Sequence, residues 1–327
     1  MKRDSSIELF RIITMLMIVA HHYVVNSGVM GLIAGQKLWG ANGFLLCMGA
    51  WGKVGINCFV LITGYFMCEK SISLRKFLKL YLEIVFYALV LNAIFALTGY
   101  APWTWRMLFC TFFPIRGITS NYFTGAYLVF FLTIPFLSSL VNHLTQKQHL
   151  LLIALLIPVY TIFPFVPGIV FAYNHVEWFA ILFFIGAYLR KYPSWLTESR
   201  RIWGWMSLFA IVLGVGSVLM LQAVFGARQF ALLADSNKFT ALACGICFFL
   251  YFKNLKLGYS RIINALASTA FGVLLIHANS AAMRRWLWQD ICQVLEVYRC
   301  HCESRGGHRY ASLSRLRGNH LSLLLGV

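Results

Sequence analysis

The sequence predicts an all-α, polytopic transmembrane helical bundle. Of its 327 residues, 60% are hydrophobic and only 12% are charged, and its mean hydropathy is +0.73. A soluble domain carries about twice that charged fraction, so lipid is the natural solvent for much of this surface. The apolar runs are continuous instead of alternating, and a segment in lipid must satisfy its own backbone polar groups. These observations favour helices over a closed barrel.

About nine apolar runs are long enough to cross a bilayer, which takes roughly 17–25 residues. They cover residues 7–25, 43–67, 77–98, 122–141, 150–166, 176–189, 202–221, 230–252 and 262–278. Pro158, Pro164 and Pro167 perturb the fifth run, and the sixth run is short, so these boundaries are the least sharp. Most cysteines lie inside apolar runs and are predicted to be buried as small apolar side chains; these are Cys47, Cys58, Cys110, Cys244 and Cys247.

Positive charge is concentrated in every second connection between these runs. The formal net charge of +18 therefore indicates membrane topology and no nucleic-acid partner, because positive loops stay in the cytoplasm. The basic side holds Lys2, Arg3, Lys70, Arg75, Lys76, Lys79, Lys147, Arg190, Lys191, Arg200, Arg201, Lys253, Lys256 and Arg261. The other side holds residues 100–121 and 167–175, with only Arg106 and Arg116. The pattern predicts a multi-pass protein, in contact with membrane lipid, whose N-terminus is cytoplasmic.

The first run carries the most informative polar residues. Arg11 and His22 are eleven residues apart, so they share one helix face and lie about 16 Å apart along the axis. Ionisable groups at membrane depth are costly and face a bundle interior or a water-filled cleft. Arg11 suits an anionic donor, and His22 suits proton abstraction. Alternatively, Arg11 snorkels to the interface, and His21 and His22 only mark the outer boundary.

Polar residues in the next two runs have two interpretations. Asn57 and Thr63 can hydrogen-bond across a helix interface, which is a packing role. Arg75, Lys79 and Glu83 follow one another at four-residue intervals. They form either a charged helix entrance, in which Lys79 neutralises Glu83, or a site for the phosphates of a donor.

Four motifs in order resemble the membrane acyltransferase-3 family. They are Leu9-Phe10-Arg11 followed by His22, residues 59–66, residues 121–127 with 134–137, and residues 268–277, which end in His277. Each motif is weak alone, but together they cover residues 1 to about 290 of the chain. The departures are small, since Phe10 stands where the family usually has Leu and Thr63 where it has Ser.

The resemblance implies O-acylation of a polysaccharide or lipid-linked glycan by an acyl-CoA, in the bacterial cytoplasmic (inner) membrane. It implies no permanently bound cofactor and no metal. The expected catalytic residues, by position, are His22, Arg11 and His277. The expected donor-binding residues are Arg75, Lys76 and Lys79, and the expected cleft residues are Glu8, Asn57, Thr63 and Glu83. The most specific expectation is an O-acetyltransferase that uses acetyl-CoA to modify a surface polysaccharide such as O-antigen.

Residues 291–327 do not continue the pattern. They mix Arg, His, Cys, Ser and Gly without periodicity, and Cys300-His301-Cys302 with His308 fits no closed zinc spacing. The resemblance leads us to expect a tenth span here. We therefore predict a transmembrane acyltransferase domain over residues 1–290 and an atypical tail over 291–327, either out of frame or disordered.

Other functions stay open at this point. Transfer of a different acyl group, such as succinyl, would use the same motifs. A transporter or flippase for a glycan or lipid would also carry intramembrane His and Arg, and labelled acetyl-CoA distinguishes it from an enzyme. An inactive, truncated acyltransferase is the third possibility, which the coding frame beyond residue 290 would test.

Overall fold

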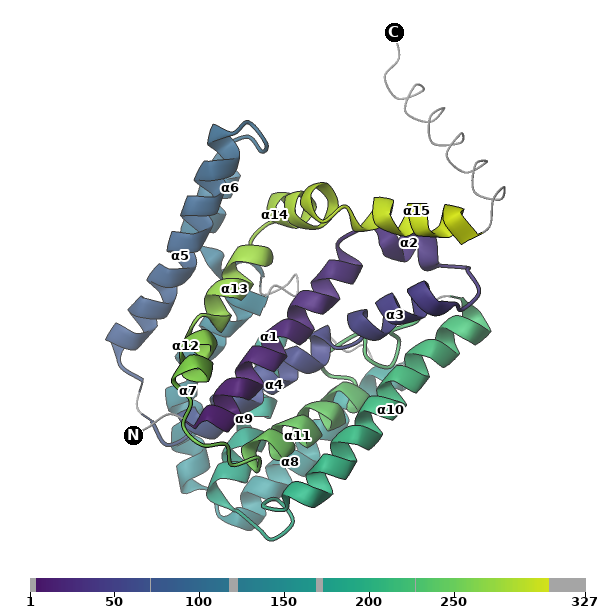
Figure 1. Cartoon of the computed structure of the whole chain (residues 1–327). Helices are drawn as coiled ribbons and strands as arrows, with labels where there is room; N and C mark the ends of the chain where they lie inside the picture. Colours follow the sequence, from purple (N-terminus) through teal and green to yellow (C-terminus); the bar gives the residue numbers. More distant parts are fainter. Residues whose placement is uncertain (1–3, 71, 118–122, 169–172, 227, 306–327) are drawn as a thin grey trace.

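The computed structural model describes residues 4–305 except 71, 118–122, 169–172 and 227, and in this part of the chain it contains helices and no strand (Figure 1). The predicted all-α class is confirmed. The longer helices are α1 (Ser5–Val25), α3 (Gly40–Gly49), α4 (Gly52–Met67), α5 (Leu74–Leu97), α7 (Phe123–His143), α8 (Gln146–Thr161), α9 (His175–Lys191), α10 (Arg200–Phe225), α11 (Phe239–Lys253) and α15 (Val294–Arg305). The short ones are α2 (Val29–Ile33), α6 (Trp105–Phe112), η1 (Pro114–Gly117), η2 (Phe163–Phe165), α12 (Arg261–Ser268), α13 (Ala270–His277), α14 (Ala281–Arg285) and the π-helical η3 (Trp286–Ile291).

Several of these helices are long and apolar enough to cross a membrane. Within the described residues there are five such segments: α1, α3 with α4, α5, α7 and α10. A sixth is added if Arg261–His277 and Ala281–Cys300, which meet at 98°, count as one span. The chain is thus a polytopic helical membrane protein.

The predicted count of about nine spans exceeds this number because three predicted runs fall on shorter helices. Residues 150–166 fall on α8, which has 16 residues, 176–189 on α9, which has 17, and 230–252 on α11, which has 15. The predicted eighth run begins nine residues before α11 because residues 235–238, Asp-Ser-Asn-Lys, form a turn ahead of the helix. Short polar side chains of this kind favour turns over helix interiors.

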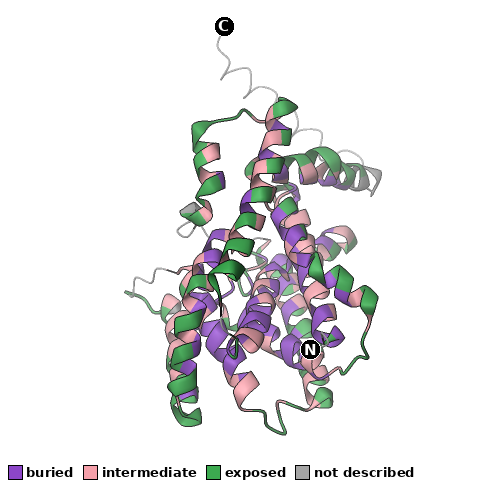
Figure 2. Cartoon of the chain, turned by 90° about the vertical axis from the view of Figure 1, so that its left-hand side faces the viewer, coloured by how far each residue is buried: buried purple, intermediate pink, exposed green. Residues whose placement is uncertain are grey.

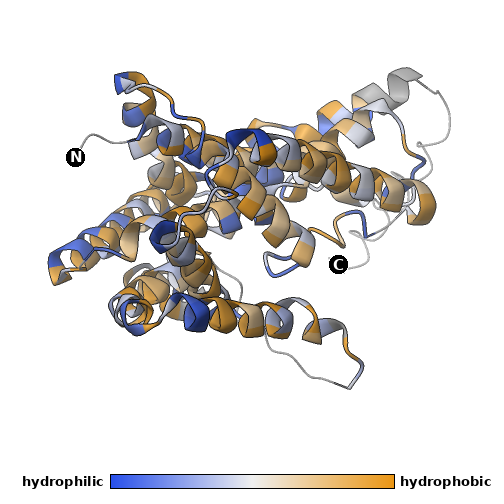
Figure 3. Ribbon diagram, turned by 90° about the horizontal axis from the view of Figure 1, so that it is seen from below, coloured by the Kyte–Doolittle hydropathy of each residue, from blue (hydrophilic) through white to orange (hydrophobic). Residues whose placement is uncertain are grey.

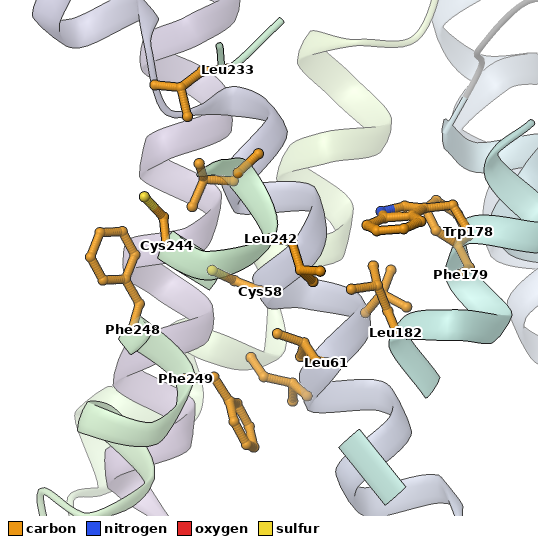
Figure 4. Packing of buried hydrophobic residues seen from close by; sticks show 14 of the residues in the cluster. Cys58, Leu61, Trp178, Phe179, Leu182, Leu233, Leu242, Cys244, Phe248 and Phe249 are labelled. Atoms are coloured by element: carbon orange, nitrogen blue, oxygen red, sulfur yellow. The ribbon is translucent and has the colours of Figure 1, made fainter. Parts of the chain in front are cut away.

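The core lies where α1, α4, α9 and α11 pack together. In Figure 4, α4 lies between the side chains of α9 and those of α11. The labelled residues are Cys58 and Leu61 of α4, Trp178, Phe179 and Leu182 of α9, Leu242, Cys244, Phe248 and Phe249 of α11, and Leu233 before it. Cys58, Cys244 and Cys247 are buried as predicted, whereas Cys47 and Cys110 are only half-buried.

The peripheral helices expose apolar side chains, as lipid-facing helices do. Only 22% of the spanning window of α5, and the same share of α10, is buried within the protein. Figure 2 shows buried residues gathered in the middle of the bundle and exposed residues along its edge, and Figure 3 shows the hydrophobic colour along most helices. These faces fit a bilayer as solvent.

The segment after residue 290 is partly helical. α15 lies beside α2 (Figure 1), where Val294 and Tyr298 are buried and Tyr298 Oη donates a hydrogen bond to Gln36 Oε1 at 2.8 Å. The rest of the predicted tail, residues 306–327, lies outside the described residues, as do the side chains of His301, Cys302 and His308.

Candidate active site

Two histidines from distant parts of the sequence meet at one end of the bundle. His22 lies in the last turn of α1, and His277 is the last residue of α13. Their ring centroids are 5.1 Å apart, with the ring planes inclined at 55°. Met15 and Ile18 of α1 pack against Leu274 in α13, which holds the two helices together below the rings. The contact thus depends on the fold and not on local sequence.

A backbone hydrogen bond determines which nitrogen of His277 is basic. Nδ1 of His277 lies 2.6 Å from the carbonyl oxygen of Val273, one turn earlier. A carbonyl oxygen only accepts, so Nδ1 carries the proton and Nε2 keeps a free lone pair. Nε2 of His277 is buried without a partner, and so is Nδ1 of His22. Buried polar atoms without partners are uncommon and often mark a functional site.

The neighbouring His21 has a structural role. Its Nδ1 donates to the carbonyl oxygen of Gly49 at 2.5 Å, which ties the end of α1 to α3. His21 is therefore engaged by the backbone, whereas the ring of His22 faces His277.

Trp288 packs beside His277. Its ring meets that of His277 edge-on, at 6.1 Å between centroids, and that of Tyr23 at 6.0 Å. Trp288 lies in η3, and its Nε1 is buried without a partner. The sequence interpretation did not include Trp288, because only the turn between α13 and α14 brings it over the site.

A second polar group surrounds Arg11, about three turns down the same helix. The guanidinium of Arg11 lies 3.8 Å from the carboxylate of Glu8, which is 7% exposed. Arg11 also interacts electrostatically with Tyr127 of α7, whose hydroxyl is 3.1 Å from that of Thr63 in α4. Three of the predicted residues, Glu8, Arg11 and Thr63, therefore gather here, and Tyr127 joins them.

Aromatic side chains separate the two polar levels. Phe59 of α4 packs edge-on against Phe123 at 6.0 Å and stacks with Phe271 of α13 at 6.5 Å. At 1.5 Å per residue, the eleven residues from Arg11 to His22 span about 16 Å. The site thus has a cationic level and a histidine level with an aromatic layer between them.

Asn57 joins three elements of the bundle. Its Oδ1 accepts from Trp178 Nε1 at 2.9 Å, and its Nδ2 donates to the carbonyl oxygen of Ser236 at 2.8 Å. The side chain is fully buried, so α4, α9 and the turn before α11 are held by this one amide. Asn57 is a packing residue that also positions parts of the site.

Replacing Asn57 with leucine is expected to lower the free energy of unfolding by about 2–5 kcal/mol, because two buried groups lose their hydrogen-bond partners. The measurement is the unfolding midpoint in detergent as SDS is added. Asn142→Leu, at an exposed position at the end of α7, is the matched control and should change stability by less than about 0.5 kcal/mol. Equal midpoints for the two variants would show that the buried amide is not structural.

The predicted donor-binding residues of α5 stand apart from Arg11. Arg75, Lys76 and Lys79 are exposed at the start of α5, and Glu83 is half-buried. Arg75 and Lys79 line a shallow groove of about 580 Å³ with Leu74, Leu78 and Leu82. α5 packs on α13, α6 and α7.

Comparison with known families agrees with this geometry. The model of the acyltransferase domain of the acyltransferase-3 family matches residues 4–291. This chain belongs to the acyltransferase-3 family. No curated protein and no solved structure matches it. The suspected family is thereby confirmed, and the protein is a membrane-embedded acyltransferase.

The acyltransferase identity gives the two polar levels a chemical meaning. Acyl transfer to a hydroxyl needs a base near the hydroxyl and a site that binds the acyl donor. Among the described residues, no group of three or more His, Cys, Asp or Glu side chains could hold a metal ion.

Proposed function

We propose that this acyltransferase moves an acetyl group from acetyl-CoA to a hydroxyl of a surface polysaccharide, or of its lipid-linked precursor, such as O-antigen. The observation that supports this best is the pair His22 and His277, whose rings are 5.1 Å apart and which leave Nδ1 of His22 and Nε2 of His277 without partners. A buried base of this kind suits removal of a proton from a sugar hydroxyl.

In the proposed step, His22 takes the hydroxyl proton as the hydroxyl oxygen attacks the thioester carbonyl carbon. The new C–O bond forms, the C–S bond breaks, and the departing CoA thiolate takes the proton from the imidazolium. The free Nε2 lone pair of His277 lies beside this ring and stabilises its protonated form. One histidine thereby acts first as base and then as acid.

We place the donor at the Arg11 level. A cation with three or more N–H donors binds phosphate oxygens well, and Arg11 is half-exposed while its neighbour Glu8 is buried. Arg75, Lys76 and Lys79 add positive charge at the start of α5. The basic connections support a cytoplasmic N-terminus in the bacterial inner membrane. Acetyl-CoA would then enter from the cytoplasm, with its flexible arm reaching through the aromatic layer toward His22.

The test is transfer of label from [14C]acetyl-CoA into glycan. Protein reconstituted in nanodiscs is given the glycan-bearing lipid fraction of bacterial membranes, and [14C]succinyl-CoA serves as the competing donor. We expect label from the acetyl donor in the glycan, released by mild alkali as an O-ester is. Absence of glycan label from acetyl-CoA would overturn the proposal, and preferential use of succinyl-CoA would correct the donor.

Arg11→Ala is expected to raise the KM for acetyl-CoA about 10- to 100-fold, since one or two charge-assisted hydrogen bonds to phosphate are lost. The KM for the glycan should change little. Arg201→Ala, which removes an exposed basic residue at the start of α10, is the matched control. If both variants have the donor KM of the original protein, Arg11 does not bind the donor.

A further inference from the structure

A cluster of buried polar atoms without partners lies near the histidine pair but outside it. His175, the first residue of α9, is 1% exposed, and neither of its ring nitrogens has a hydrogen-bond partner. The ring of Tyr173 is 5.2 Å from that of His175. The hydroxyls of Tyr173 and Ser236 lie near each other, but neither makes a well-formed hydrogen bond. Four buried polar atoms in one place are thus unsatisfied.

Lys53 connects this cluster to His22. Lys53 is the second residue of α4, and its side chain is half-buried. Gly52, the residue before it, packs against His21, since a Cβ built on Gly52 would be 2.3 Å from Cγ of His21. The charge of Lys53 acts on His22, His175 and Asp235. Within the described residues, Lys53 makes no hydrogen bond or ion pair. A partly buried ammonium without a partner is costly, and its three donors are available to a ligand. Lys53 therefore adds a positive charge that acts on both His22 and the unsatisfied cluster.

The elements that carry the cluster are held firmly. Asn57 bonds the carbonyl of Ser236 and the indole of Trp178, three residues into α9 from His175. Asn174 caps α9 by accepting from the backbone N–H of Glu177 at 3.0 Å. Polar groups in a packed core normally have hydrogen-bond partners. Side chains that lack partners although the backbone around them is firmly held are therefore typical of a preorganised binding site.

We propose that Lys53, Tyr173, His175 and Ser236 form the subsite that binds the sugar unit whose hydroxyl is acetylated. This rests on the proposed transfer to a glycan and names the residues that recognise the acceptor. The ligand of this subsite would be a hydroxyl-rich sugar ring. Each sugar hydroxyl can both donate and accept a hydrogen bond, so such a ring can bond to the lysine ammonium, the two imidazole nitrogens and the two protein hydroxyls. Tyr173 and Lys53 form the half-exposed edge of the subsite. Gly52, the residue before Lys53, packs against His21, the neighbour of His22, so a hydroxyl of a sugar bound at this subsite would be directed toward His22.

The experiment measures both apparent KM values in nanodiscs, for [14C]acetyl-CoA and for the glycan-bearing lipid fraction. We expect His175→Leu and Lys53→Met each to raise the glycan KM about tenfold or more and to leave the acetyl-CoA KM within twofold. His175→Asn, which keeps a donor and an acceptor, should recover part of the loss. His149→Leu is the matched control, since His149 is equally buried but bonds the carbonyl of Phe184 at 2.9 Å.

A second measurement does not depend on catalysis. The same lipid fraction should raise the thermal unfolding midpoint of the original protein and of His149→Leu, but not that of Lys53→Met or His175→Leu. If this shift is seen without acetyl transfer, the subsite stands and the proposed function fails. If His175→Leu simply stabilises the protein and keeps the glycan KM, the cluster is an internal packing defect and the subsite is refuted. Absence of any shift in the original protein also refutes it.

Discussion

Replacing His22 with alanine is expected to slow acetyl transfer about 10²- to 10⁴-fold, the usual contribution of a positioned general base. The ring of His22 faces that of His277 at 5.1 Å, and its Nδ1 has no protein partner to lose. Folding should therefore be preserved. The donor KM should also be preserved, because the proposed donor site at Arg11 lies about three helix turns away. The measurement is the rate of label transfer from [14C]acetyl-CoA at saturating donor.

The adjacent histidine supplies a matched control. His21→Ala removes the hydrogen bond to the carbonyl of Gly49, so it should lower stability and spare the transfer rate of the folded fraction. His277→Ala should slow transfer less than His22→Ala, since it removes the neighbour of the base and not the base. A His22→Ala protein that transfers acetyl at the original rate, or a larger loss in His21→Ala, would assign the base elsewhere.

The class of the fold could be predicted because it depends on composition and local pattern. Long apolar runs without alternation require helices in lipid, and α1, α5, α7 and α10 each contain a predicted run nearly in full. Boundaries were less predictable where polar and apolar residues mix. Residues 230–238 are apolar at their start, but the short polar side chains of residues 235–238 favour a turn. Asn57, on a distant helix, stabilises this turn by donating to the carbonyl oxygen of Ser236.

Some features of the candidate site could likewise be predicted from the sequence, and others could not. Arg11 and His22 share a helix, so their separation follows from helix geometry alone. His277 lies at the end of the ninth predicted run, but only the packing of α13 on α1 sets how closely its ring approaches that of His22. Lys53, His175 and Trp288 carried no pattern that would single them out, because each reaches the site through a turn between helices. A lone lysine or histidine at a helix end more often marks the membrane interface.

The spacing of charged residues on α5 also could not predict which face of this helix is exposed. The four-residue interval from Arg75 to Lys79 defines one helix face but not the direction in which that face points. In the structure this face carries Leu78 and Leu82 and is exposed, while Ile84 and Phe95 face the bundle. Binding of the donor by Arg75 and Lys79 stays a proposal.

Gly64→Val is expected to prevent folding of the bundle, and Gly64→Ala to lower the free energy of unfolding by about 3 kcal/mol or more. Gly64 belongs to the second-span motif and lies where α4 and α9 approach most closely. A Cβ atom built on Gly64 would be 2.8 Å from both Cα and the carbonyl oxygen of Phe183. On the facing helix, a Cβ on Gly186 would be 2.7 Å from the carbonyl oxygen of Leu61. Backbone atoms cannot turn aside as the end of a side chain can, so the helices must separate.

The consequence for the site makes this prediction specific. α4 carries Asn57, Thr63 and Lys53, and α9 begins at His175, so separation of the two helices would disturb both polar levels at once. Gly216→Ala is the matched control, because it is also a helical glycine but a Cβ there would meet nothing within 4 Å. It should leave stability unchanged or raise it by up to about 1 kcal/mol, through helix propensity alone. The measurements are the unfolding midpoint in detergent and the yield of monodisperse protein, compared between the Gly64 variants and Gly216→Ala. If Gly64→Ala were as stable as Gly216→Ala, the close contact of α4 with α9 would not exist in the membrane.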